Sequence, residues 1–324
     1  MAKVTINDVA KKSGYGLGTV SRVISGDKSV KDSTREKILK TIEELHYVPN
    51  VNGARLRKKH SGVIAVLVPV INHPFFAEFV ECLEHIAGKE GYSLILLTSQ
   101  MDEQKEEDIL WKIRKKEIDG AIFVTHYEHK NEDINGLPLV SIDRHLNHVV
   151  PFVSSNNYEA TKEAIEYLIS TGAKKIGFIG TKPFVESEVT LREKAYLDVM
   201  KEHNYTPYIV YEVVKHGEEK ELVDKFIEKY PDVDAVFASG SSSSTYIYNK
   251  YVSMGKKFPE DIQLISYDGV FNSWEDAPIV TSIEQPIKEM AEQSFKILID
   301  IINGKEVNQI TLLKTKFVKG KTTK

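Results

Sequence analysis

Residues 15–22 read YGLGTVSR, a stretch in which two glycines precede the pattern of a short helix. At 100° per residue, Gly18 and Arg22 point to one side of a helix over residues 17–25. The opposite face is apolar and consists of Val20, Val23 and Ile24. The stretch therefore predicts a helix with one buried face and an outer face of little bulk that can lie close to a partner.

The residues on either side of this stretch predict two more helices. Thr5 is a candidate N-cap with Asp8 at capping-box spacing, and Gly14 supplies a stop for the first helix. A third helix is expected to begin near residues 32–33, with apolar positions at Ile38, Leu39, Ile42 and Leu45. Two helices joined by a tight turn with glycine, followed by a supporting third helix, are the helix-turn-helix arrangement.

In that arrangement the start of the second helix enters the major groove of DNA and presents side chains to base edges. Gly16 and Gly18 would let the helix backbone come close to the bases. Leu17 can touch thymine methyl groups, and Arg22 can reach guanine or phosphate. The alternative is a three-helix cap that binds no ligand.

Charge distribution favours the DNA-binding interpretation. Residues 1–60 hold 13 Lys and Arg against 6 Asp and Glu, a net charge of +7, whereas the whole chain has −4. The remainder therefore carries −11. A small basic module on a large acidic body indicates that the module meets a polyanion and that the body does not.

Length and composition limit the class of protein. A chain of 324 residues with 41% hydrophobic and 28% charged residues is typical of a globular protein of two or three domains. The single cysteine, Cys82, cannot form an internal disulfide, which suits a reducing compartment. No apolar signal core or membrane-length run is present. We expect a cytoplasmic protein without a membrane partner.

From residue 61 onward, short apolar runs alternate with amphipathic stretches. The expected strands are residues 63–70, 93–98, 121–125, 139–143, 176–180, 235–238 and 262–267. The expected helices are residues 76–89, 105–116, 158–170, 191–203, 219–229, 245–254 and 287–302. This alternation predicts α/β architecture with doubly wound parallel sheets, in which ligands bind at the carboxyl ends of the strands.

The motifs of the chain also carry a resemblance to a known family. The head segments VTINDVAKKSG, TVSRVISG and VKDSTREKILKTIEELHYVPN resemble the DNA-binding head of the LacI/GalR family of bacterial repressors. The resemblance continues through GVIAVLVPVINHPFFAEFV, EIDGAIFV, PLVSID, FPEDIQLISYDG and IEQP, so it covers essentially the whole chain. It implies a body of periplasmic-binding-protein type I, with two subdomains and an effector between them.

The resemblance implies a DNA-reading role for Leu17, Gly18 and Arg22 and a hinge helix whose leucine wedges into the minor groove. Leu56 falls at the wedge position, and Gly53-Ala54 stands where the family usually has Ala-Arg. Glycine disfavours helix by about 1 kcal/mol relative to alanine, so we expect this hinge to order less readily. The candidate DNA-binding residues are Thr5, Leu17, Gly18, Thr19, Ser21, Arg22, Asn50, Arg55, Leu56 and Arg57.

The domain organisation that follows has three parts. Residues 1–49 form the helix-turn-helix domain, 50–60 the hinge, and 61–324 the effector-binding and dimerisation domain. We expect an N-subdomain at about 61–157 and 286–314, and a C-subdomain at about 158–285 and 315–324. The chain would cross between them near Asn157, near Gln285 and around Thr315.

Polar residues directly after the expected strands are the candidate effector contacts. They are His73, Phe75, Asp143, Arg192, Gly240, Ser241 and Asp268. By resemblance, the acids would accept bonds from sugar hydroxyls and the arginine would donate to oxygens. Each could instead be a helix cap or a partner in a buried salt bridge.

The pair Gly240-Ser241 departs from the family, which usually carries Asn-Asp there. A glycine and a row of serines at a helix start are suited to an anion, so a phosphorylated sugar is one candidate effector. The alternatives are that Ser242 or Ser243 caps the helix, or that the pocket has decayed. The aromatic wall that the family usually carries is also missing around residues 216–217.

Enzymatic and metal-binding motifs are weak. The histidines in HYEH (126–129) and HLNH (145–148) have no regular zinc spacing, and loop histidines are the better interpretation. No nucleophile elbow, Walker motif or dinucleotide fingerprint is present. We therefore expect neither an enzyme nor a cofactor.

These patterns together predict a dimeric transcriptional repressor of carbohydrate-utilisation genes that binds a palindromic operator and responds to a sugar or sugar-phosphate effector. A catabolite-control-type regulator that uses a protein corepressor is the main variant. A protein of another class, a cytoplasmic sugar-binding module without DNA function, would have no use for residues 1–60.

Overall fold

The computed structural model describes residues 4–48, 60–100, 102–124, 127, 129–147, 149–184, 187–214, 217–269 and 279–324. The chain divides into two compact units, Met1–Gly62 and Val63–Lys324, called here the head and the body. The hinge residues Asn50, Arg55, Leu56 and Arg57, and Gly53-Ala54 with them, lie outside the described residues.

The head is a three-helix unit, as predicted. Its helices are α1 (Ile6–Ser13), α2 (Leu17–Ile24) and α3 (Asp32–Glu44). Their shared core is Val9, Val20, Val23, Val30 and Ile38. The Asp8 carboxylate accepts hydrogen bonds from the backbone nitrogen and the hydroxyl of Thr5, at 2.8 and 2.7 Å. Leu39, expected in the core, is 49% exposed because it lies on the outer side of α3.

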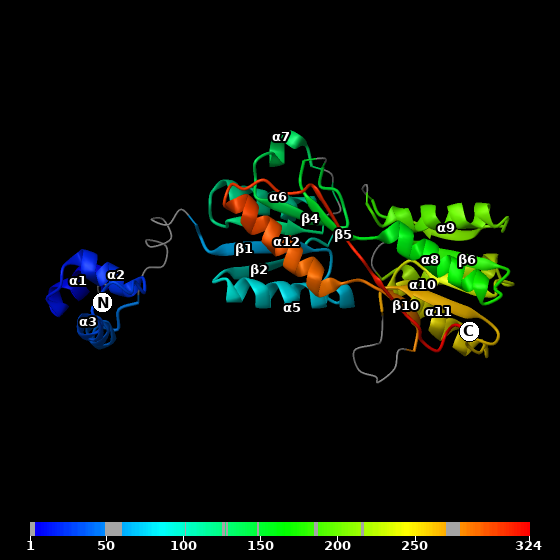
Figure 1. Cartoon of the computed structure of the whole chain (residues 1–324), viewed down its shortest axis with the longest axis horizontal. Helices are drawn as coiled ribbons and strands as arrows, with labels where there is room; N and C mark the ends of the chain where they lie inside the picture. Colours follow the sequence, from blue (N-terminus) through cyan, green and yellow to red (C-terminus); the bar gives the residue numbers. More distant parts are fainter. Residues whose placement is uncertain are drawn as a thin grey trace. The chain divides into compact units, whose positions relative to one another are not determined.

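The body contains two six-stranded sheets (Figure 1). The first has the order β11-β5-β4-β3-β1-β2, and all of its pairs are parallel. Its strands are β1 (Val63–Val68), β2 (Ser93–Thr98), β3 (Gly120–Phe123), β4 (Leu139–Ile142), β5 (Phe152–Ser155) and β11 (Ile310–Leu313).

Helices cover both faces of the first sheet. Helices α5 (Pro74–Lys89) and α12 (Ile287–Ile302) pack on one face over Ile64, Val66 and Val68. Helix α6 (Glu103–Arg114) packs on the other face over Ala65 and Leu67, next to the short α7 (Asn131–Ile134). The side chains of β1 point alternately to the two faces, and both faces are buried.

The second sheet has the order β12-β10-β9-β8-β6-β7. Its strands are β6 (Ile176–Thr181), β7 (Tyr208–Glu212), β8 (Ala235–Ala238), β9 (Gln263–Tyr267), β10 (Thr281–Glu284) and β12 (Lys316–Val318). Helices α8 (Asn157–Ser170) and α9 (Thr190–Glu202) cover one face; α10 (Glu219–Lys229) and α11 (Ser241–Ser253) cover the other. The edge pair β10–β12 is antiparallel, and the remaining pairs are parallel.

The polypeptide passes between the two sheets three times: after β5, between β10 and α12, and between β11 and β12 (Figure 1). The predicted fold class, a small helical head and an α/β body of two doubly wound sheets, is confirmed. Among the described residues, no helix is long and apolar enough to span a bilayer.

Candidate functional site

The outer face of α2 carries the candidate DNA-reading residues of the head. Leu17 is 48% exposed, and Gly18 and Arg22 are exposed beside it, whereas Val20 and Val23 are buried on the inner side. No side chain caps the start of α2, and the Thr19 N–H donates to the Gly16 carbonyl within the first turn. Thr19 and Ser21 are half-buried at the margins of this face. An exposed leucine beside a glycine is a surface suited to contact with a flat partner.

The candidate effector site is a cavity of about 620 Å³ in the body. It is lined by residues that follow strands of both sheets, at their carboxyl ends. All seven residues predicted from the sequence line it: His73, Phe75, Asp143, Arg192, Gly240, Ser241 and Asp268. Sequence positions almost 200 residues apart therefore meet around one hollow of the size usual for small-molecule sites.

Arg192 lies in the first turn of α9 and is 4% exposed. Its Nε donates to Asn157 Oδ1 at 2.6 Å, and its Nη1 donates to the carbonyl of Ser239 at 2.8 Å. The guanidinium carbon lies 3.4 Å from the centre of the Tyr267 ring. Three partners thus hold the guanidinium plane, and the rest of it lines the cavity.

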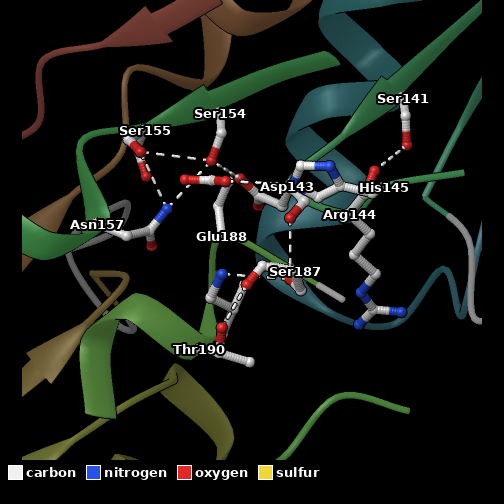
Figure 2. Close-up of polar contacts among 11 residues, drawn as sticks. Ser141, Asp143, Arg144, His145, Ser154, Ser155, Asn157, Ser187, Glu188 and Thr190 are labelled. Atoms are coloured by element: carbon white, nitrogen blue, oxygen red, sulfur yellow. Dashed lines mark hydrogen bonds and ion pairs between the residues drawn. The ribbon is translucent and has the colours of Figure 1, made fainter. Parts of the chain in front are cut away.

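Asp143 directly follows β4 and is 7% exposed (Figure 2). Its backbone is in the left-handed region, at φ 59°, and its carboxylate accepts a hydrogen bond from Ser154 at 2.7 Å. Burial raises the pKa of this carboxyl, and the charge of Arg192 and the Ser154 bond act in the opposite direction. The side chain is a buried acceptor at the cavity wall.

Asp268 directly follows β9, also in the left-handed region, at φ 69°. Its carboxylate accepts a hydrogen bond from Gln285 Nε2 at 2.7 Å, and Gln285 Oε1 accepts from the Ser155 hydroxyl at 2.8 Å. Ser155 also lies 2.9 Å from the hydroxyl of Tyr267. This chain of bonds joins the end of β5 in the first sheet to the ends of β9 and β10 in the second.

His73 and Ser241 come from different sheets of the body and meet at the cavity. His73 precedes α5, Ser241 is the first residue of α11, and His73 Nε2 lies 3.1 Å from the Ser241 hydroxyl. Phe75 and Phe76 add an apolar wall, with ring centres 5.4 Å apart. Gly240 is the N-cap of α11, and no side chain caps this helix, so Ser242 and Ser243 are not its caps.

Several lining residues were missed by the sequence analysis, among them Arg144, Thr181, Glu219, Ser239 and Gln285. Arg144 and Gln285 carried a usable signal, because each adjoins a strand end in a motif that was already recognised. Burial lowers the pKa of Arg144 to about 10, so its guanidinium stays charged at neutral pH. Glu219 carried no such signal, because it opens α10 after a long connection.

The described histidines of the two loop motifs, His129 and His145, lie in loops as expected. His129 is only 5% exposed, and its Nε2 lies 2.7 Å from the buried carboxylate of Glu106. His145 lies 3.2 Å from Glu188. His126 and His148 lie outside the described residues. In the part of the chain that the structure describes, no group of three or more His, Cys, Asp or Glu is placed to hold a metal ion.

The cavity offers carboxylates, guanidinium groups, an amide and hydroxyls around an apolar wall. Such a set can bind a small, polar, hydroxyl-rich molecule by accepting and donating hydrogen bonds on several sides. A helix-turn-helix head on a two-sheet body with such a cavity is the architecture expected of a ligand-responsive DNA-binding regulator.

The chain belongs to the bacterial regulatory proteins of the lacI family. Residues 5–50 match that family, and residues 61–321 match the periplasmic binding proteins and sugar binding domain of the LacI family. The resemblance drawn from the sequence motifs is therefore confirmed.

Individual relatives align along nearly the whole chain. The ribose operon repressor of Halalkalibacterium halodurans is 31% identical, covering 99% of this chain and 97% of its own. Catabolite control protein A of Streptococcus mutans is 28% identical, covering 94% and 93%. The lac repressor dimer bound to operator and the anti-inducer ONPF has a TM-score of 0.84 at 20% identity, covering 99% of both chains, which shows a shared fold.

Proposed function

We propose that this regulator is a repressor of carbohydrate-utilisation genes that binds a palindromic operator as a dimer and releases or tightens its hold when a small molecule occupies the body cavity. The observation that carries the DNA-binding part is the outer face of α2. There Leu17, Gly18 and Arg22 are exposed together on a helix whose inner residues are buried, within the region that matches the lacI family.

The proposed DNA contact is direct reading of the major groove by the start of α2. Leu17 would meet thymine methyl groups and Arg22 guanine or phosphate, with Thr5, Gly18, Thr19 and Ser21 around them. Thr5 has a second role, because its hydroxyl bonds Asp8 within α1. In the hinge, outside the described residues, Leu56 would wedge into the minor groove, and Asn50, Arg55 and Arg57 would contact the backbone.

The cavity supports a sugar as the effector. Asp143 and Asp268 are acceptors on opposite sheets, Arg192 is a fixed donor, and Phe75 is an apolar wall. A ligand that bridges the two sheets changes DNA binding only as far as it prefers one arrangement of the body over another. The ribose operon repressor among the relatives makes D-ribose a reasoned first probe.

A sugar phosphate is the second candidate. The uncapped start of α11 and the guanidinium groups of Arg144 and Arg192 favour an anion. The carboxyl groups of Asp143, Glu219 and Asp268 on the same cavity oppose it. Because the carboxyl groups outnumber the guanidinium groups, the neutral sugar is the first choice.

The proposal is tested in two independent steps. Duplexes selected by the wild-type protein from a randomised palindromic library supply an operator, and Arg22→Ala and Leu56→Ala should then lose specific binding. The thermal stability of the protein is measured in the presence of D-ribose, of D-ribose 5-phosphate and of similar pairs of free and phosphorylated sugars. A ligand that binds the folded state raises that stability. Operator affinity intact in both variants would refute the DNA-binding role.

A protein corepressor remains the variant to test if the sugar panel has no effect. Catabolite control protein A is among the relatives, at 28% identity.

Stabilisation by the free sugar supports the neutral effector, and stabilisation by the phosphorylated sugar alone supports the anion. If neither stabilises the protein, the regulator is bound to immobilised operator DNA and incubated with a lysate of cells grown on glucose. Retention of a second protein with the regulator would show that a corepressor is recruited.

A further inference from the structure

Residues 187–190, which lead into α9 of the second sheet, lie beside Asp143 at the end of β4 in the first sheet (Figure 2). We call these residues the strap. Ser187 is 3% exposed, and it forms an isolated antiparallel bridge with Arg144. A loop of one subdomain is thus held by backbone pairing to the other.

Two hydrogen bonds from the strap end on one atom of Asp143. The Ser187 hydroxyl and the backbone nitrogen of Glu188 both donate to the Asp143 carbonyl oxygen, each at 2.9 Å. The same Ser187 oxygen accepts from the backbone nitrogen of Val189 at 3.2 Å, which fixes the turn. The peptide plane that follows Asp143 is therefore oriented by residues of the opposite sheet.

A side-chain pair closes the strap at its outer side. His145 Nε2 lies 3.2 Å from Glu188 Oε1, and both side chains are 18% exposed. The His145 ring also packs against Phe152 of β5, with ring centres 4.4 Å apart. The two residues on either side of Arg144, Asp143 and His145, are thus both engaged by the strap.

This arrangement matters because Asp143 has two ends with different partners. Its carboxylate lines the cavity and its carbonyl belongs to the strap, while its left-handed backbone, at φ 59°, sets the angle between them. Left-handed geometry at a residue other than glycine persists only where its surroundings impose it. At its other end the strap continues into α9, which carries Arg192 two residues after Thr190.

We propose that the strap is a positioning element: Ser187 and Glu188 hold Asp143 in its ligand-facing orientation and keep the two subdomains together before any effector binds. Effector affinity then depends on Ser187, a residue that does not line the cavity. This rests on the proposed function for the meaning of the cavity, but the strap itself is tested in the ligand-free protein.

The test is hydrogen–deuterium exchange of the full-length, ligand-free protein with a matched pair of variants. Ser187→Ala removes the hydroxyl bond across to Asp143, whereas Thr190→Val removes a bond inside the strap, from Thr190 Oγ1 to the Ser187 carbonyl at 2.7 Å. Exchange in peptides covering residues 142–147 should become about tenfold faster in Ser187→Ala, as for the loss of one hydrogen bond of ordinary strength. It should stay within about twofold of wild type in Thr190→Val.

Unchanged exchange at residues 142–147 in Ser187→Ala overturns the proposal, and so does equal acceleration in both variants, which would show only general loosening. A second variant, Glu188→Ala, should accelerate the same peptides by removing the His145 partner. If D-ribose binds the wild type, its Kd should rise about tenfold in Ser187→Ala and stay unchanged in the control Thr190→Val. A wild-type protein that binds neither sugars nor DNA would contradict the proposed function but leave the exchange result standing.

Discussion

Asp143 and Asp268 occupy equivalent positions in the two sheets and share the same unusual backbone, with φ of 59° and 69°. Each follows the third strand of its sheet, β4 or β9, and each backbone nitrogen donates to the neighbouring strand, at Val153 or Ile283. Each carboxylate accepts a bond from a residue next to it in space, Ser154 or Gln285. The cavity therefore has two carboxylate acceptors, one from each sheet, and both are held by the same combination of left-handed backbone and hydrogen bond.

Replacement at either aspartate should separate conformation from charge. Asn tolerates the left-handed region, whereas a β-branched residue does not. Asp268→Asn should stay within about 1 kcal/mol of wild type, and Asp268→Val should lose roughly 1–3 kcal/mol more, the usual size of such backbone strain. Urea denaturation measures both. Equal stability of the two variants would show that the left-handed geometry is not imposed by the fold.

The same pair shows what the sequence could predict. LVSID (139–143) and LISYD (264–268) both have the apolar pattern of a buried strand ending in an acid, so the sequence placed both aspartates at strand ends. Parallel strands bring their carboxyl ends to one edge, and the seven candidates therefore meet in one cavity. The sequence did not predict that the two sheets share one strand order, because each five-residue stretch records only an apolar strand and its final aspartate.

Other features depend on packing that local patterns do not record. Strands β5 and β10 are four residues long and contain serines, so their periodicity is too short to detect. Helix α11 begins at Ser241, four residues before the expected start, because its first turn is made of serines with low helix propensity. The strap pairs residues of different subdomains, and no spacing in the sequence indicates that contact.

Two residues of helix α2, one exposed and one buried, should separate the effect on DNA recognition from the effect on the stability of the head. Leu17 is 48% exposed and Val20 is fully buried. Leu17→Ala should leave the unfolding curve unchanged and reduce affinity for selected operator DNA by roughly 1–3 kcal/mol, the range for one base contact. Val20→Ala should destabilise the head by about 1–3 kcal/mol through the lost methyl groups and the space they leave. If Leu17→Ala bound the operator as tightly as wild type, α2 would not be the reading helix.

His129 should give the body a pH-dependent stability. Burial alone would lower the pKa of His129, but the Glu106 hydrogen bond and the charges of Glu106, Glu107 and Glu103 raise it above its ordinary value of 6.5. A raised folded-state pKa means that this stabilisation is complete below about pH 6.5 and is lost as the pH rises through the folded value. His129→Asn should cost about 3 kcal/mol at pH 6, as when a buried pair loses one partner, and less at pH 8.5.

Urea denaturation across that pH range measures the effect, with the exposed His85→Asn as the matched control. The control should follow the wild type at every pH. A stability difference for His129→Asn that does not change between pH 6 and pH 8.5 would show that folding does not raise the pKa of His129.

The exposed edge of the first sheet should be the place where two copies meet. Strand β2 is the edge strand, and Ile95 and Leu96 are 41% and 40% exposed on it. An open apolar edge is a template for association, and proteins that keep one usually cover it. Lysine at both positions should convert the proposed dimer into a monomer in sedimentation, and lower operator affinity because two linked heads no longer bind together. Trp111→Lys, at a residue 54% exposed on α6, is the control that should remain dimeric.

Substitutions at the start of α11 should distinguish a neutral effector from an anionic one, and Gly240 is a position where they can be made. A Cβ at Gly240 would meet no atom within 4 Å, and its φ of 179° is extended backbone that any residue adopts. Gly240→Asn should therefore fold with stability within about 1 kcal/mol of wild type. Ser241 is 2% exposed, so Ser241→Asp adds a desolvation cost, and the stability of the double variant is measured before any ligand is added. The new carboxylate lies at a helix N-terminus, where negative charge is favourable, and close to His73.

The added carboxylate repels an anion at that site but accepts bonds from hydroxyl groups. The double variant should therefore lose any thermal stabilisation by D-ribose 5-phosphate and keep or gain stabilisation by D-ribose. Gly240→Ala fills the same space without a polar group and should leave the preference between the two probes as it is in the wild type. If the phosphorylated probe still stabilises the double variant as strongly as the wild type, the phosphate does not bind at the start of α11, and its place must be sought beside Arg144 and Arg192 instead.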